Sequence, residues 1–431
     1  MLGNILVIVP ALLAICVIVL ITLLLPASLG FADAYQRTAL VLTVFFSWFP
    51  YWGPVFLWYV FWHQWVHYVQ GRYISRINWV MLEIKLPKEI NKSPLAMETA
   101  LNVLYQTSAG SWWDKYWKGK VKDWFSLEMV SFEGQIKFFI RTPWLYKNVI
   151  EAQLYGQYPD IEIYEVPDYV RYVDYRGKKG DWGIIGIEYG LTKEDPYPIK
   201  TYVDFGLDKD PKEEFKIDPL TSIIEYLGSA GKGEQIWVQI LVESATKRYH
   251  KSDGTMGNWQ DQGKDLIKKL AGRDKKDDDD KFQMMKLTKG EQEVITAIER
   301  SVGKLGFDVG IRAVYLAKKD KWHPSHIRHL GGLFRVFTSN NLNGFNFTEQ
   351  TFGWDFPWQD YDEMRLDHKR MEIFEAYKHR SWFHGPRHLK PFVLNVEELA
   401  TIYHFPGGVA QTPTFGRISS RKSEAPVNLP I

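Results

Sequence analysis

Residues 5–25 of this 431-residue sequence form a run without a charged side chain, made mainly of leucine, isoleucine and valine. A helix rises about 1.5 Å per residue, so about 20 apolar residues in a helix match the thickness of the hydrocarbon core of a bilayer. A run of this length without charge is therefore typical of a membrane span. A cleaved signal peptide fits less well, since no lysine or arginine precedes the run and it exceeds the usual apolar region of about 7–15 residues. The run therefore predicts a membrane-spanning helix over residues 5–25.

A second uncharged segment extends from Arg37 to Arg72, and aromatic side chains crowd its middle. We expect a second span over residues 39–66, kinked at Pro50 and Pro54, because proline removes a backbone hydrogen bond from a helix. The pattern leaves open whether this segment is a plain span, a kinked span or a re-entrant element.

The charges that flank the second segment predict its orientation. Arg72 and Arg76 directly follow it, whereas the connector between the two segments carries one arginine and one aspartate. By the positive-inside rule, the chain that follows lies in the cytoplasm. The sequence thus predicts a transmembrane hairpin within residues 1–76 of a multi-pass protein of the cytoplasmic membrane, with the lipid bilayer as its first partner.

Residues 77–171 alternate between strand-like and helix-like patterns. The predicted strands are 78–86, 124–132, 135–141 and 160–166, with one helix after Ser93-Pro94 and another after Thr142-Pro143. Leu145, Val149, Ala152 and Leu154 are the expected apolar contacts of that second helix. The order β-α-β-β-α-β predicts a ferredoxin-like, or split βαβ, domain.

A second domain with a similar order of elements is predicted over residues 172–345. Its first helix ends in YLGSAG at residues 226–231, much as the first helix of the preceding domain ends in YQTSAG at 105–110. A strand at 235–243, a helix at 289–304 and a strand at 307–317 follow, interrupted by a charged loop at 247–286. The expected fold class is therefore α+β, with a transmembrane hairpin followed by two ferredoxin-like domains and a short helical C-terminal region.

Residues 346–431 change character and predict a helical segment followed by a proline-rich tail. Residues 361–382 have the pattern of an amphipathic helix. Asn395, with Glu398 three residues later, has the capping-box pattern that starts a short helix.

Composition and motifs exclude several kinds of chemistry. The net charge of +2 gives no global electrostatic basis for nucleic-acid binding, and a single cysteine, Cys16, allows neither a disulfide within the chain nor a cysteine zinc site. No glycine-rich phosphate loop followed by Lys and Ser or Thr occurs, so we expect no ATP hydrolysis. The sequence predicts a protein without a cofactor and without enzymatic activity.

Three histidines, His323, His326 and His329, are spaced three apart and could share one side of a helix. A zinc site would use such nitrogens, but no cysteine or paired carboxylate completes the set. We favour a basic helix that contacts a partner or lipid headgroups, and retain the metal site only as an alternative.

The same region is locally basic, and its cations are candidate contacts for a partner or an anion. They are Lys318, Lys319, Lys321, Arg328 and Arg335. A solvated surface, a contact with anionic lipid and a contact with a nucleic-acid backbone all fit this pattern.

The C-terminal sequences FVLNVEELATIYHFP (392–406) and EAPVNLP (424–430) resemble the segment that precedes the motor domain in membrane-anchored ATPases of the FtsK–HerA superfamily, as in type IV secretion-like and conjugation machines. In that family a Walker-type ATPase domain comes next, and these 431 residues do not include one. We therefore expect either that the motor is a separate polypeptide, which would be the partner, or that the chain is a stand-alone membrane subunit of a secretion-like machine. The residues that it implies for docking that ATPase are Glu397, Glu398, His404, Phe405 and Pro406.

These patterns predict a non-enzymatic membrane anchor or scaffold subunit of a type IV secretion-like or DNA-translocation apparatus. It would partner a separate ATPase and could form a homo-oligomer. The alternative is a membrane-tethered module that binds nucleic acid or lipid.

Overall fold

The computed structural model describes residues 39, 43, 47, 49–87, 90, 92–108, 110–208, 218–272, 287–351 and 356–407. It divides into two compact units, Met1–Tyr73 with Trp112–Gly119, and Ile74–Ser111 with Lys120–Ile431. We refer to them as the helical unit and the sheet unit.

The helical unit contains α3 (Phe49–Ile74) and the short α5 (Trp112–Tyr116), joined by aromatic contacts. The Trp62 ring stacks on Trp112 with 6.5 Å between centroids. The Trp65 indole N–H donates to the carbonyl of Tyr116 at 3.1 Å. Large flat rings that retain one polar atom thus fix α5 on α3.

The predicted transmembrane hairpin is wrong. No helix in the described part of the chain has both the length and the apolar character needed to cross a membrane. Helix α3 overlaps the second predicted span, 39–66, but it is rich in Trp, Tyr, His and Gln, whose polar atoms reduce its hydropathy although it has almost no charge. The first predicted span, 5–25, lies outside the described residues. A hairpin needs two spans, so the predicted multi-pass membrane location is corrected as well.

The first half of the sheet unit has four antiparallel strands, in the order β2-β3-β1-β4. They are β1 (Trp79–Lys85), β2 (Trp124–Phe132), β3 (Gln135–Pro143) and β4 (Glu162–Val166). Helix α4 (Pro94–Leu101) follows β1, and α6 (Lys147–Gln157) follows β3. This is the strand order of a split βαβ unit. Glu133 and Gly134 both have positive φ, as a two-residue hairpin turn requires, and join β2 to β3.

The second half repeats this order as β6-β9-β5-β10. Its strands are β5 (Trp182–Leu191), β6 (Glu234–Ser244), β9 (Gly306–Lys318) and β10 (Phe345–Gln350). Helix α7 (Leu220–Gly228) follows β5, and α11 (Ser325–Gly331) follows β9. An insertion between β6 and β9 holds β7 (Tyr249–His250), β8 (Met256–Gly257), α8 (Trp259–Leu270) and α10 (Lys289–Val302).

The two halves are one sheet, because β2 pairs with β6 in antiparallel register from Trp124↔Glu243 to Phe132↔Gln235. Strand β11 (Phe392–Asn395) adds to β9 and completes a nine-stranded sheet. The segments predicted as two successive domains therefore share one core, and part of the predicted C-terminal region joins the same sheet.

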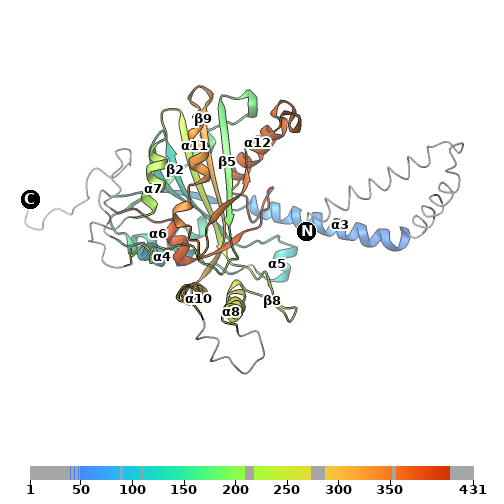
Figure 1. The fold of residues 1–431 in the computed structure, drawn as a ribbon. Coiled ribbons are helices and arrows are strands. Elements are labelled where there is room, and N and C mark those ends of the chain that lie inside the picture. Colours follow the sequence, from blue (N-terminus) through green and yellow to red (C-terminus); the bar gives the residue numbers. More distant parts are fainter. Residues whose placement is uncertain are drawn as a thin grey trace, which may run out of the picture. The chain divides into compact units, whose positions relative to one another are not determined.

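Helices cover both faces of this sheet (Figure 1). Leu101 of α4, Leu227 of α7 and Leu399 of α13 (Val396–Ile402) belong to the larger buried apolar cluster. Ile373 and Tyr377 of α12 (Met364–Lys378) belong to a second cluster. Most strand residues are buried, since apolar layers lie on both sides of the sheet.

Helix α6 differs from its predicted packing. Ile150 and Leu154, four residues apart, are buried, whereas Leu145 and Val149 are 73% and 49% exposed. A single helix turns one stripe toward the sheet, and here that stripe includes Ile150, which the prediction omitted. Leu145, Val149 and the exposed Ala152 instead point to the outside.

We predict that Gly310→Ala destabilises the sheet unit. A Cβ at Gly310 would overlap the indole ring of Trp382. Overpacking of this kind costs about 1–3 kcal/mol. The matched control is Gly156→Ala in α6, where nothing lies within 4 Å, and which should stabilise the helix by about 0.5–1 kcal/mol. Urea denaturation measures both changes; equal midpoints for the two variants would contradict the packing described.

Candidate functional site

The three histidines do not form a ligand set. His323 precedes α11 and is exposed, His326 is buried against the ring of Tyr315, and His329 stacks on Tyr226. Within the described ranges, no group of three His, Cys, Asp or Glu side chains could hold a metal ion. The geometry favours packing roles for these imidazoles over a metal centre.

The predicted basic contacts Lys318, Lys319, Lys321, Arg328 and Arg335 are all exposed. The three lysines gather where β9 ends, and the stems of Lys318 and Lys321 both lie over Gly233. The Lys319 ammonium donates to the carbonyl of Lys178 at 2.6 Å. Arg328 lies in α11 and Arg335 in the short helix Arg335–Phe337. The structure thus brings together three of the five cations.

The residues predicted to dock an ATPase are buried inside the sheet unit. Glu397, Glu398, His404, Phe405 and Pro406 all lie in the interior. The His404 imidazole is within 3.1 Å of the Asp218 carboxylate. We do not propose these side chains as docking contacts, because partners within the chain already occupy them.

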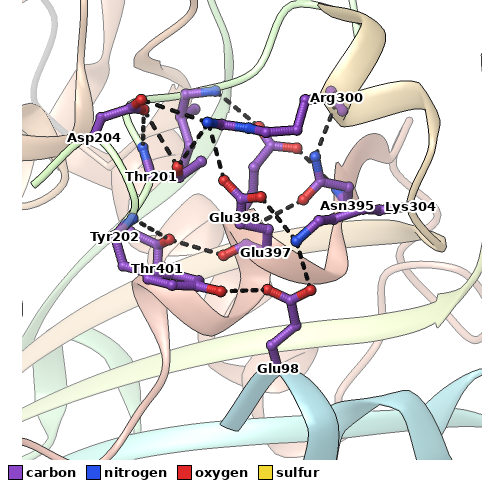
Figure 2. Close-up of polar contacts among 12 residues, drawn as sticks. Glu98, Thr201, Tyr202, Asp204, Arg300, Lys304, Asn395, Glu397, Glu398 and Thr401 are labelled. Atoms are coloured by element: carbon purple, nitrogen blue, oxygen red, sulfur yellow. Dashed lines mark hydrogen bonds and ion pairs between the residues drawn. The ribbon is translucent and has the colours of Figure 1, made fainter. Parts of the chain in front are cut away.

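Glu398 belongs to a capping box at the start of α13 (Figure 2). Its carboxylate accepts the backbone N–H of Asn395 at 2.9 Å and that of Ile199 at 2.8 Å, while the Asn395 side chain accepts the N–H of Glu398. The capping box predicted from the sequence is confirmed. Burial raises the pKa of Glu398 to about 8, although both backbone hydrogen bonds act in the opposite direction.

The neighbouring Glu397 makes ion pairs instead (Figure 2). It lies 3.1 Å from Arg300 and 2.8 Å from Lys304 of the adjoining segment. Lys304 also contacts Glu98 of α4 at 2.6 Å, and Glu98 accepts the hydroxyl of Tyr202. The two adjacent glutamates therefore face different partners, and the cluster holds α13 against α10 and α4 rather than offering an acid–base pair to a substrate.

A row of four polar side chains crosses the opposite face of the sheet. Glu128, Gln239, Arg312 and Glu188 stand in register on β2, β6, β9 and β5. All four are fully buried. Gln239 donates to Glu128 at 3.2 Å, and Arg312 donates to Glu188 at 2.6 Å. We call this set the polar row.

Two arginines that follow α12 close the ends of the polar row. Arg380 donates to Glu128 at 3.0 Å and to Asp168 at 2.9 Å. Arg387 donates to Glu188 at 3.0 Å. Burial alone would raise the pKa of Glu128, but the Arg380 guanidinium holds it below its usual value. Buried carboxylates are thus neutralised inside the fold, as burial of charge requires.

Our reading of the sequence missed the polar row. A signal was present, since Glu128, Glu188 and Arg312 each interrupt an apolar strand pattern. Such an interruption predicts a buried charge that needs a partner. It does not reveal which partner, because the residues are far apart in the chain.

Beside the polar row, one face of β9 supports two tryptophans. Gly306 lies directly under the indole of Trp259 from α8, and Gly310 under that of Trp382. Side chains at alternate strand positions share one face, so Asp308 stands between the two glycines. The absence of side chains at both glycines lets the rings approach the strand.

The two tryptophans border a cleft of about 870 Å³. Its other walls come from the end of β5, from residues 192–195, 246, 248–250 and 389–393, and from α8. Arg248 lies 2.6 Å from Asp308 and 4.0 Å from Asp195. Burial raises the pKa of Asp308 to about 6, against the lowering effect of Arg248. Asp308 is buried and paired with Arg248, so its carboxylate is poorly placed to exchange a proton with a ligand in the cleft. The arrangement favours a cleft that binds a ligand over one that transfers a proton to it.

We predict that Glu398→Gln changes how stability depends on pH. The pKa of Glu398 in the folded chain is about 8, above the usual value of 4.5. Between these two pH values the folded chain therefore binds more protons than the unfolded chain. As a result, the free energy of unfolding falls as the pH rises from about 4.5 to about 8. The variant lacks this titration. It loses one backbone hydrogen bond at every pH, but its stability relative to the wild type should rise by up to about 1.4 kcal/mol per pH unit between about pH 5 and pH 8.

Chemical denaturation over this pH range measures the effect. Glu363→Gln, at an exposed position, is the control and should follow the wild type throughout. A constant difference between Glu398→Gln and the wild type would show that Glu398 titrates normally.

None of the curated proteins matches this chain. Residues 79–417 match the model of a protein family described as "Domain of unknown function (DUF8128)". The match starts at the first residue of β1 and extends past α13, so it includes both halves of the sheet, the polar row and the cleft. Because it covers well over half of the sequence, the chain belongs to the family described as "Domain of unknown function (DUF8128)".

Proposed function

We propose that the chain is a non-enzymatic scaffold protein that binds a partner rather than converting a substrate. The buried ionisable groups support this role, because Glu128, Glu188 and Glu397 are each paired with a cation of the same chain. A general acid or base must come within hydrogen-bonding distance of its substrate. These groups instead hold separate elements of the sheet unit together.

The observation that carries the proposal is a group of exposed apolar side chains on the short helix Trp144–Tyr146 and the first turn of α6, which follows it directly. Trp144 is 63% exposed, and with Leu145 and Val149 it forms an apolar surface that we call the α6 patch. Exposed apolar side chains that are grouped within a few residues of the chain are suited to contact with a partner, since isolated ones are ordinary on a surface and grouped ones are not. Ile150 and Leu154 fix the other face of the helix in the core, so the α6 patch is presented on a well-supported element.

The partner implied by the resemblance of residues 392–430 is a separate ATPase of the FtsK–HerA superfamily. We propose that the α6 patch contacts it, in place of the buried residues around Glu398. It stays a prediction that the chain is a subunit of a type IV secretion-like or DNA-translocation apparatus. It also stays a prediction that the chain forms a homo-oligomer.

We predict that the double variant Leu145→Asp, Val149→Asp loses the partner without loss of folding, because both side chains are exposed. Tagged full-length chain is captured from cells that carry it naturally, and the bound proteins are identified by mass spectrometry. The wild type should recover an ATPase, and the double variant at least tenfold less.

Met256→Asp is the matched control, since it places a charge at another exposed apolar position, in β8, and should retain the ATPase. Recovery of no ATPase by the wild type would contradict the proposed partner. Equal recovery by the double variant would contradict the α6 patch as its site.

The lysine cluster favours a second candidate function, the binding of a nucleic-acid backbone. Lys318, Lys319 and Lys321 lie close together, and the exposed Lys232 is next to Gly233, over which two of them lie. Several cations within a small area can contact successive phosphates.

We predict that the triple variant Lys318→Ala, Lys319→Ala, Lys321→Ala weakens binding of single-stranded DNA and reduces its salt dependence. Each lost phosphate contact lowers the slope of log K against log salt concentration by about 0.7. The control is Lys268→Ala, Lys269→Ala, at exposed positions on α8. The full chain is used, since β2 of the first half pairs with β6. Absence of binding, or an equal slope in the triple variant, would remove this candidate.

A further inference from the structure

The cleft opens beside β9 at the point where the strand paired with β9 changes from β5 to β11. Strand β5 pairs with β9 as far as Tyr189↔Ile311, and β11 begins at Phe392↔Val309. Gly310 lies between these two pairings. The cleft is therefore bounded by two strand ends, and its volume of about 870 Å³ suits a small molecule.

One wall holds an unused donor. Trp382 lines the cleft and is only 2% exposed, and its indole N–H has no acceptor among the residues that the structure describes. Buried polar groups are normally hydrogen-bonded, because an unpaired donor in the interior costs free energy. A ligand in the cleft could supply the missing acceptor.

Arg248 brings further donors to the same cleft. Its side chain is 31% exposed, and one terminal nitrogen donates to Asp308. A guanidinium has five N–H groups in a planar fork, which suits two-point contact with an oxyanion. No other hydrogen bond joins this guanidinium to the described part of the chain. Lys390, also exposed, lies on the lining with it.

The carboxylates around the cleft are already engaged. Asp195 accepts the backbone N–H of Val393 and faces Arg248. Glu194 accepts the amide of Gln262 at 3.3 Å. Glu188 is shared by Arg312 of the polar row and by Arg387. Each of these carboxylates thus has a donor within the fold, whereas the indole N–H of Trp382 and part of the Arg248 guanidinium do not, so a complementary ligand supplies acceptors.

We propose that this cleft binds a small molecule that carries a carboxylate or phosphate group on a flat apolar body. Arg248 and Lys390 contact the oxyanion, the indole N–H of Trp382 donates to a further acceptor, and the rings of Trp259 and Trp382 pack against the apolar body. The inference rests on the cleft alone and does not depend on the proposed scaffold role.

Calorimetric titration of the full-length chain tests this site, with benzoate and phenyl phosphate as probes and benzamide as the uncharged comparison. At least one anion should bind, and benzamide should bind at least tenfold more weakly. Preference for benzoate or for phenyl phosphate identifies which oxyanion the site takes.

Variants locate the binding. Arg248→Gln should weaken binding of the anion at least tenfold, and Lys390→Gln and Trp382→Phe should each weaken it several-fold. The control is Lys247→Gln, at the exposed position before Arg248, which should leave binding unchanged. Arg248→Gln removes the ion-pair partner of the buried Asp308 and could unfold the chain for that reason. Lys390 is exposed, so Lys390→Gln should fold and keeps the test decisive. The proposal is overturned if neither anion binds, if benzamide binds equally well, or if Lys390→Gln and Trp382→Phe bind like the wild type.

Discussion

Antiparallel pairing of β2 with β6 is the interaction on which the rest of the sheet unit depends. It joins two halves with the same strand order through nine residue pairs. In isolation each half would expose one of these strands as an open edge, and pairing removes both edges. The same pairing brings Glu128 next to Gln239, so it also sets up the polar row.

The polar row links this joint to the segment after α12. Arg380 contacts the carboxylate at one end, and Arg387 the carboxylate at the other. Arg380 adopts positive φ just beyond the helix, a position that glycine usually takes. A buried ion pair adds little net stability but is costly to break, so these contacts specify how α12 lies on the sheet.

Charge has a different role on the two faces of the sheet. Around α13, Glu397 and Glu398 attach a short helix to the elements beside it, and residues 392–406 are thereby built into the core. On β9, Gly306 and Gly310 leave space for the rings of Trp259 and Trp382, which border the cleft. The cleft beside β9 offers the donors of Arg248 and Trp382, whereas the charges of the neighbouring polar row are paired within the fold.

The sequence by itself determined the local elements of this protein. Alternation of apolar residues located β2 and β3, the Glu133-Gly134 turn joined them, and Asn395 with Glu398 set the start of α13, because each depends on residues close together in the chain. It could not determine which face of α6 is buried, because that depends on how the helix packs against the sheet. The shortfall of α3 from a membrane span is, by contrast, a matter of its Trp-, Tyr-, His- and Gln-rich composition. Only the tertiary structure decided the polar row and the cleft, because both depend on register between strands that are distant in the chain; neighbours in the polar row are 73 to 124 residues apart.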